Sequence, residues 1–140
     1  MFPSAARRCS VHAAGIFADH CVQGSDGARL CRDLEVAHAQ LVLRKGYHPN
    51  IDSYSAFIEA DGKTTTGGYL RERGIDNVYV CGLATDFCVA WTALDARKLG
   101  FAAAVIEDAC RAIDTQGSLA AAGEKMERAG VKRIQSGDVA

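Results

Sequence analysis

The stretch NVYVCG, residues 77–82, opens the part of the sequence that decides the fold. Its β-branched and aromatic residues predict a strand that ends at Gly82. Apolar residues then recur at helical spacing over 86–99, and Gly100 follows the last of them. Further on, residues 102–106 predict a strand, the alanine-rich residues 116–129 a helix, and residues 131–134 a last strand. Strands and helices that alternate in this way predict an α/β fold with a parallel sheet.

The sequence before this stretch is less regular. The apolar run AQLVL at 39–43 stands before Arg44, Lys45 and Gly46, and it predicts a buried strand. A short helix is predicted over 69–73 because Gly74 suits the position that follows a helix.

The composition is that of one globular domain. The 140 residues are 49% hydrophobic and 24% charged, and residues 1–15 carry no clear pattern, so we expect an unmatched segment over 1–15 and a domain over 16–140. Within the helix predicted over 86–99, Trp91 and Leu94 share a face and are expected in the core.

Charge and hydropathy narrow the class of partner. A net charge of −1 argues against a nucleic-acid partner. No apolar run approaches the roughly 20 residues that a membrane helix needs. Six scattered cysteines without a CxxC pair, and an N-terminus without the apolar core of a secretory signal, predict a cytoplasmic protein with reduced thiols. The sequence leaves a homo-oligomer open.

The predicted sheet indicates where chemistry would take place. In an open parallel sheet, ligands bind beyond the carboxyl ends of the strands. Lys45 follows the first predicted strand, residues 82–88 follow the second, and Glu107 and Asp108 follow the third. If the first two strands are neighbours, Lys45 and Cys88 share one pocket.

Cys88 is the sharpest candidate for a reactive group. It lies at the start of a predicted helix, where unpaired N–H groups and the helix dipole favour a thiolate and could hold an oxyanion. Thr85 or Asp86 would cap this helix. The alternatives are that Cys88 is a small buried apolar residue and that Lys45 is a solvated lysine at a strand end. A single His20 could be a metal ligand, but one histidine is weak evidence, and a structural histidine is the more usual interpretation.

Five separated motifs, in order, resemble those of the nicotinamidases, which belong to the isochorismatase-like cysteine hydrolases. They are DHCVQG (19–24), LRKG (43–46), DSYSAF (52–57), GLATDFCV (82–89) and VIEDAC (105–110). The resemblance covers about residues 16–135. It implies a three-layer αβα fold, a parallel sheet with helices on both faces, and hydrolysis of nicotinamide to nicotinic acid and ammonia in NAD salvage.

The resemblance also implies roles for individual residues. Cys88 would be the nucleophile that forms a thioester, and Lys45 the catalytic lysine. The backbone N–H groups of Ala84 and Cys88 would form the oxyanion hole, next to a cis peptide bond between Leu83 and Ala84.

The same resemblance implies a substrate pocket and a metal. Phe17 and Tyr54 would line the pocket for the amide substrate, nicotinamide. His20 would be one ligand of a divalent metal ion, often zinc.

The front of the sequence departs from the family. The strand with the general-base Asp and the Asp-x-His metal motif are not found, so we expect an N-terminally incomplete fold, through a truncated or misread gene start, and an incomplete metal site. Loss of a general base costs about 10²–10⁴-fold in rate, so little activity is expected from this chain alone. The alternatives are a related cysteine amidase or isochorismatase-like hydrolase, a degenerate homologue, and a non-catalytic scaffold or interaction domain.

Overall fold

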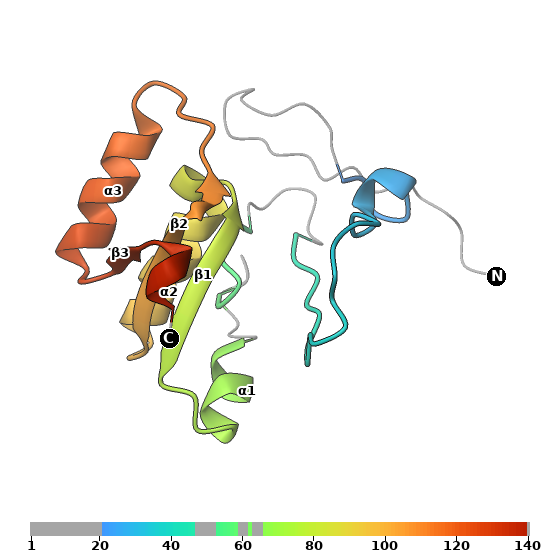
Figure 1. Ribbon diagram of the computed structural model, residues 1–140, viewed down its shortest axis with the longest axis horizontal. Helices are drawn as coiled ribbons and strands as arrows, with labels where there is room; N and C mark the ends of the chain where they lie inside the picture. The colour runs from blue at the N-terminus through green and yellow to red at the C-terminus, as the bar shows by residue number, and fades with distance from the viewer. Residues whose placement is uncertain (1–20, 47–52, 59–61, 63–65, 140) are drawn as a thin grey trace. The chain divides into compact units, whose positions relative to one another are not determined.

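The structure is a computed structural model, and it describes residues 21–46, 53–58, 62 and 66–139 of the chain (Figure 1). It divides into two units, Met1–Ser53 and Tyr54–Ala140. The second unit holds the helices and strands of the predicted α/β pattern.

A parallel sheet of three strands forms the centre of the second unit. The strands are β1 (Asn77–Leu83), β2 (Ala102–Arg111) and β3 (Lys132–Ile134), and their order in the sheet is β1-β2-β3. Both pairs are parallel. The sequence prediction of a parallel sheet with intervening helices is therefore confirmed.

Strand β2 runs five residues past its predicted end at Ile106. Val80 pairs with Val105 and Gly82 pairs with Cys110, so a step of two residues on β1 faces a step of five on β2. Three extra residues of β2 thus form a bulge, which bends the strand locally. Glu107 and Asp108 were predicted to follow the strand, but they lie within it, because β1 continues to pair with β2 beyond them.

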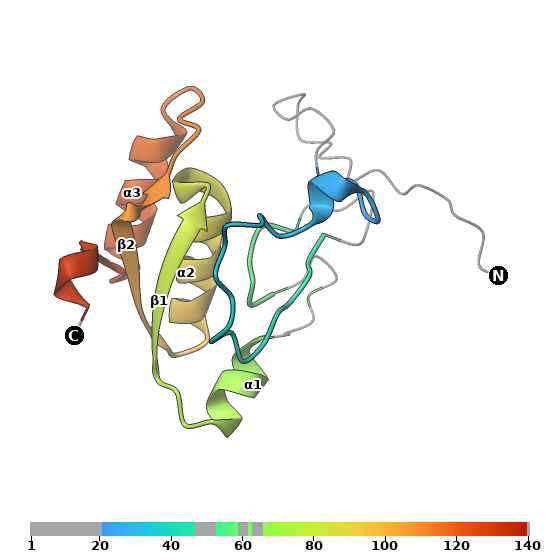
Figure 2. The same cartoon turned by 45° about the vertical axis from the view of Figure 1, so that its right-hand side comes forward.

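Three α-helices belong to this unit: α1 (Thr66–Glu72), α2 (Ala90–Lys98) and α3 (Ser118–Arg128). Helix α2 connects β1 to β2, helix α3 connects β2 to β3, and the two helices contact each other. Because successive right-handed crossovers that advance in one direction keep their helices on one face, α2 and α3 cover the same face of the sheet, as Figure 2 shows for α2 behind β1. No described helix has the length and apolar character needed to cross a membrane.

Small residues let α2 approach the sheet closely. Ala90, Ala93 and Ala96 are 2%, 0% and 0% exposed and form the buried stripe of the helix. Val105 of β2 and Met126 of α3 are the largest side chains that are fully buried in the described part of the chain. The core therefore lies between the sheet and the pair α2 and α3.

Trp91 does not belong to this core, and the prediction that placed it there is wrong. Its side chain is 42% exposed, while Leu94 is half-buried against the core. The buried stripe starts at Ala90, and the next residue along a helix is rotated by about 100°. Since alanines fill the stripe, the larger Trp91 lies beside it.

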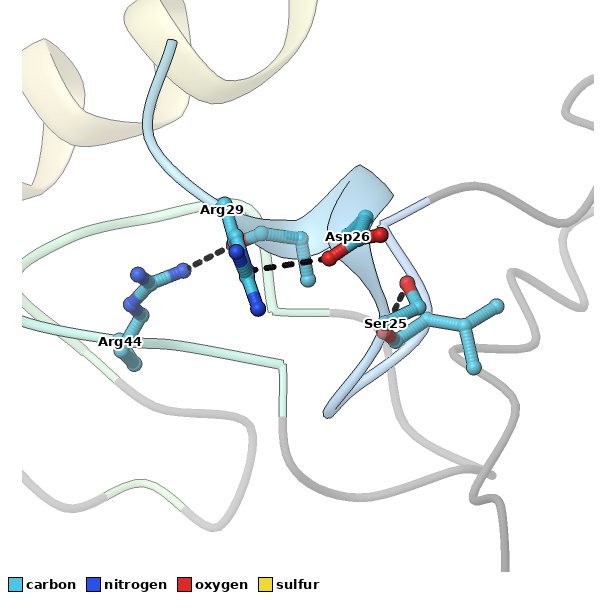
Figure 3. A network of polar contacts seen from close by, with 6 residues as sticks. Ser25, Asp26, Arg29 and Arg44 are labelled. Carbon is cyan, nitrogen blue, oxygen red and sulfur yellow. Dashed lines mark hydrogen bonds and ion pairs between the residues drawn. The ribbon is translucent and has the colours of Figure 1, made fainter. Parts of the chain in front are cut away.

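The first unit contains a single short helical turn among its described residues, η1 (Asp26–Ala28). Figure 3 shows its polar contacts: Arg29 pairs with Asp26 at 3.1 Å, and the Arg44 guanidinium donates to the carbonyl of Ala28. The last contact ties the segment before Lys45 to η1.

The predicted strand at 39–43 does not form in this unit. Leu41, Val42 and Leu43 are 43%, 54% and 47% exposed, and no secondary structure is assigned to them. A strand needs a partner for its backbone N–H and C=O groups, and none of the described strands pairs with this run. Its apolar composition alone therefore predicted a strand wrongly.

Candidate active site

A tight turn carries Cys88 at the carboxyl end of β1. The peptide bond between Leu83 and Ala84 is cis, as the family resemblance predicted. The N–H groups of Phe87 and Val89 both donate to the carbonyl of Ala84 at 3.1 Å. Because these are the two neighbours of Cys88 in the chain, the backbone around the half-buried Cys88 is held from both sides.

This turn is the π-helical segment η2 (Thr85–Val89), which leads directly into α2. The predicted helix over 86–99 is thus divided into a π-helical and an α-helical part. The prediction that Thr85 or Asp86 caps the helix is wrong, since Ala84 occupies the N-cap position without a side-chain cap. The carboxylate of Asp86 binds a different segment instead.

Asp86 is a buried acid, 6% exposed, that accepts three hydrogen bonds. The N–H groups of Ile113 and Asp114 donate to it at 3.1 and 2.8 Å, and the Ser118 hydroxyl donates at 2.5 Å. Burial alone would raise the pKa of Asp86, but the hydrogen bonds from Ser118, Ile113 and Asp114 outweigh it, so the pKa is lowered. The sequence analysis missed this role because all three partners lie 27 to 32 residues away.

Tyr54 belongs to an aromatic cluster that includes the residue preceding Cys88. Its ring lies 5.9 Å from that of Phe87 and 6.5 Å from that of Trp91, with the second pair stacked at 19°. We call Tyr54, Phe87 and Trp91 the aromatic cluster. Sequence reasoning selected Tyr54 but took Trp91 for a core residue.

The loop that carries Tyr54 is fastened to two helices. The N–H of Ala56 donates to the Thr92 hydroxyl of α2 at 3.1 Å, and the Thr66 hydroxyl of α1 donates to the carbonyl of Ala56. These bonds fix the backbone two residues from Tyr54. The position of its ring against α2 is therefore set by tertiary contacts.

Lys45 lies in the first unit, where its ammonium group donates to the carbonyl of Ser53 at 2.7 Å. Cys88 lies in the second unit. That the two share one pocket stays a prediction.

Phe17 and His20, predicted to line the pocket and to bind metal, lie outside the described residues. Within those residues, no three histidine, cysteine or acidic side chains gather in a group that could hold a metal ion. The metal site predicted around His20 therefore stays a prediction.

The other described cysteines differ from Cys88 in their surroundings. Cys21, Cys31 and Cys81 are exposed, Cys110 is buried, and each of these described cysteines is a thiol outside any disulfide. Burial raises the pKa of the Cys110 thiol, which favours its neutral, unreactive form.

Glu107 and Asp108, expected near the site, hold the C-terminal segment. The Glu107 carboxylate binds Arg133, and Asp108 accepts from the N–H of Ser136 at 2.8 Å and from its hydroxyl. The Ser136 hydroxyl is the main cause of the lowered pKa of Asp108. These contacts give both acids a structural role.

A cavity of about 490 Å³ lies between β2 and α3. Thr85, Cys110 and Met126 line it together with charged residues of α3, whereas Cys88 does not. Because Thr85 is the first residue of η2, the cavity borders the turn that carries Cys88 without reaching Cys88 itself.

The model of the isochorismatase domain matches residues 9–137. The nicotinamidase of Acinetobacter baylyi is 57% identical over 126 residues, which are 89% of this chain and 59% of that protein. The chain thus spans about three fifths of the length of this relative, and 47% of the nicotinamidase of Escherichia coli.

Solved structures are similar as well. PnC1 from L. infantum, in complex with nicotinate, is 40% identical with a TM-score of 0.85 and covers 94% of this chain and 67% of its own. The pyrazinamidase of Pyrococcus horikoshii, in complex with zinc, is 35% identical with a TM-score of 0.69 and covers 83% of this chain and 61% of its own. These similarities support the predicted fold.

Proposed function

Because this chain belongs to the isochorismatase family, we propose that it acts as a cysteine amidohydrolase that converts nicotinamide to nicotinic acid and ammonia. The observation that carries the proposal is the turn after β1, where two hydrogen bonds to the carbonyl of Ala84 hold the backbone around Cys88. The similarity to the nicotinamidase of Acinetobacter baylyi supports this choice of substrate.

In the proposed reaction, the Cys88 sulfur attacks the carbonyl carbon of the amide. The N–H groups of Ala84 and Cys88 donate hydrogen bonds to the carbonyl oxygen and stabilise the negative charge that develops on it. The C–N bond breaks, and the leaving nitrogen takes up the proton that the Cys88 thiol has lost and departs as ammonia. Water then attacks the thioester carbon, the C–S bond breaks, and nicotinic acid and the Cys88 thiol are released.

From the resemblance to the family, we assign Lys45 as the catalytic lysine and Phe17 and Tyr54 as residues that line the substrate pocket. The aromatic cluster supports the last assignment, because a flat pyridine ring packs well against aromatic side chains. PnC1 from L. infantum was solved with nicotinate, which is the product of the proposed reaction.

The proposal includes a divalent metal ion with His20 as one ligand, and zinc is the first candidate because the Pyrococcus horikoshii pyrazinamidase binds it. When bound, such an ion would orient the ring nitrogen of the substrate. We also place the protein in the cytoplasm, where the thiols of its described cysteines would stay reduced.

The test is the formation of nicotinic acid from nicotinamide, followed by chromatography, with the Acinetobacter baylyi enzyme as positive control. The rate of this chain is expected to be low, and Cys88→Ala should abolish the product formation that remains, since no thioester can form. Cys31→Ala, which removes an exposed thiol of the first unit, should leave the rate unchanged. Equal rates for the wild type and Cys88→Ala would contradict the proposal and favour a non-catalytic scaffold.

A further inference from the structure

A carboxylate in the turn that carries Cys88 binds a distant part of the chain. Asp86 stands two residues before Cys88 in η2. Its three hydrogen-bond partners lie in the connection between β2 and α3 and at the first residue of α3, Ser118.

The connection between β2 and α3 is itself held by a hydrogen bond to the first turn of α3. Asp114 adopts a left-handed conformation with φ of 54°, and its own carboxylate accepts the N–H of Leu119 at 3.3 Å. The backbone N–H of Asp114 points to Asp86 while its side chain holds the start of α3. Movement of the Cys88 turn would therefore break the hydrogen bonds that Ile113, Asp114 and Ser118 donate to Asp86.

The arrangement requires a carboxylate. Ile113 donates to one oxygen of Asp86, and Asp114 and Ser118 donate to the other. An asparagine would place its NH₂ group against a backbone N–H in either orientation, so at least one donor would lose its acceptor.

We infer that Asp86 is the positioning residue for Cys88: its carboxylate fastens the Cys88 turn to the connection between β2 and α3, and this sets the sulfur in its reactive position. The inference rests on the proposed function. It predicts that loss of these bonds slows the chemical step and leaves substrate affinity intact, since a misplacement of about 1 Å can cost about 10²-fold in rate.

The experiment compares the wild type with Asp86→Asn and with the matched pair Ser118→Ala and Ser118→Thr, the second of which keeps the hydroxyl. Steady-state kinetics with nicotinamide give kcat and KM. Alkylation by iodoacetamide, mapped by mass spectrometry, gives the rate at Cys88 relative to the exposed Cys31. If the buried Cys110 is not alkylated in the same samples, the second unit is folded.

For Asp86→Asn we expect kcat to fall by about 10²-fold with KM nearly unchanged, and the preference for alkylation at Cys88 over Cys31 to disappear. Ser118→Ala should show a smaller loss in kcat, which Ser118→Thr restores. A folded Asp86→Asn variant with wild-type kcat and wild-type alkylation would overturn the inference. If Asp86→Asn exposes Cys110, the Ser118 pair decides, and equal kcat for alanine and threonine overturns it.

The two levels of the proposal fail in different ways. If the wild type shows neither turnover that depends on Cys88 nor selective alkylation of Cys88, both the proposed function and this inference are contradicted. A wild type with both properties, which Asp86→Asn retains, would remove the role of Asp86 alone.

Discussion

Replacing Thr92 by valine should loosen the loop that presents Tyr54. The Thr92 hydroxyl accepts the N–H of Ala56 at 3.1 Å, and Thr92 is 9% exposed. Valine has almost the same shape but offers no acceptor. The variant thus removes one bond that holds the loop, while the bond from the Thr66 hydroxyl to Ala56 remains.

The expected loss in free energy of unfolding follows from the burial of the Ala56 N–H and of the side chain at position 92. Depriving a buried donor of its acceptor costs about 1–3 kcal/mol, and the half-buried Ala56 belongs at the lower end of that range. The new methyl group at position 92 returns up to about 0.8 kcal/mol. The free energy of unfolding should therefore fall by about 0.5–1 kcal/mol, which lowers the urea midpoint by about 0.2–1 M for a slope of about 1–3 kcal/mol per M.

Tryptophan fluorescence measures the local effect, because Trp91 is the sole tryptophan and stacks on Tyr54. Urea unfolding gives the stability, and acrylamide quenching of Trp91 in the folded protein should increase as Tyr54 moves away. Thr92→Ser, which keeps the hydroxyl, is the control and should quench like the wild type. Unchanged quenching and an unchanged midpoint in Thr92→Val would show that this hydrogen bond does not hold the loop.

Two further predictions concern the buried part of the second unit. A group whose pKa is lowered by folding, as that of Asp86 is, stabilises the folded state above its unfolded pKa, and this contribution is lost as the pH falls through the folded pKa. The stability advantage of the wild type over Asp86→Asn in urea unfolding should therefore be full at neutral pH and shrink below about pH 4; a constant difference would contradict the assignment of the charge. Met126 is 2% exposed, so its replacement by alanine should lower the free energy of unfolding by about 2–5 kcal/mol, and its replacement by leucine by under about 1.5 kcal/mol. Thermal unfolding measures both losses, and equal losses would refute close packing at this position.

Local sequence signals predicted most elements of the second unit. The runs that became β1 and β2 are rich in β-branched and small apolar residues, and Gly74 and Gly100, which precede these strands, adopt positive φ after α1 and α2. These signals act within a few residues, so they can be recognised without knowledge of the fold.

Predictions that depended on a partner elsewhere in the chain were less successful. The run 39–43 has the composition of a buried strand, but no described strand pairs with it. The end of β2 was placed too early, since the bulge that lengthens it is imposed by pairing with β1. Trp91 has helical spacing to Leu94, yet the buried stripe of α2 is formed by alanines beside it.

The sequence by itself determined the order of strands and helices and the position of Cys88 just after a strand, because both depend on residues adjacent in the chain. Only the tertiary structure revealed that Asp86 binds residues 27 to 32 positions away and that Tyr54 stacks on Trp91. Hydrogen bonds and ring contacts of this kind form when packing brings distant segments together, and one sequence contains no local signal that identifies the partner.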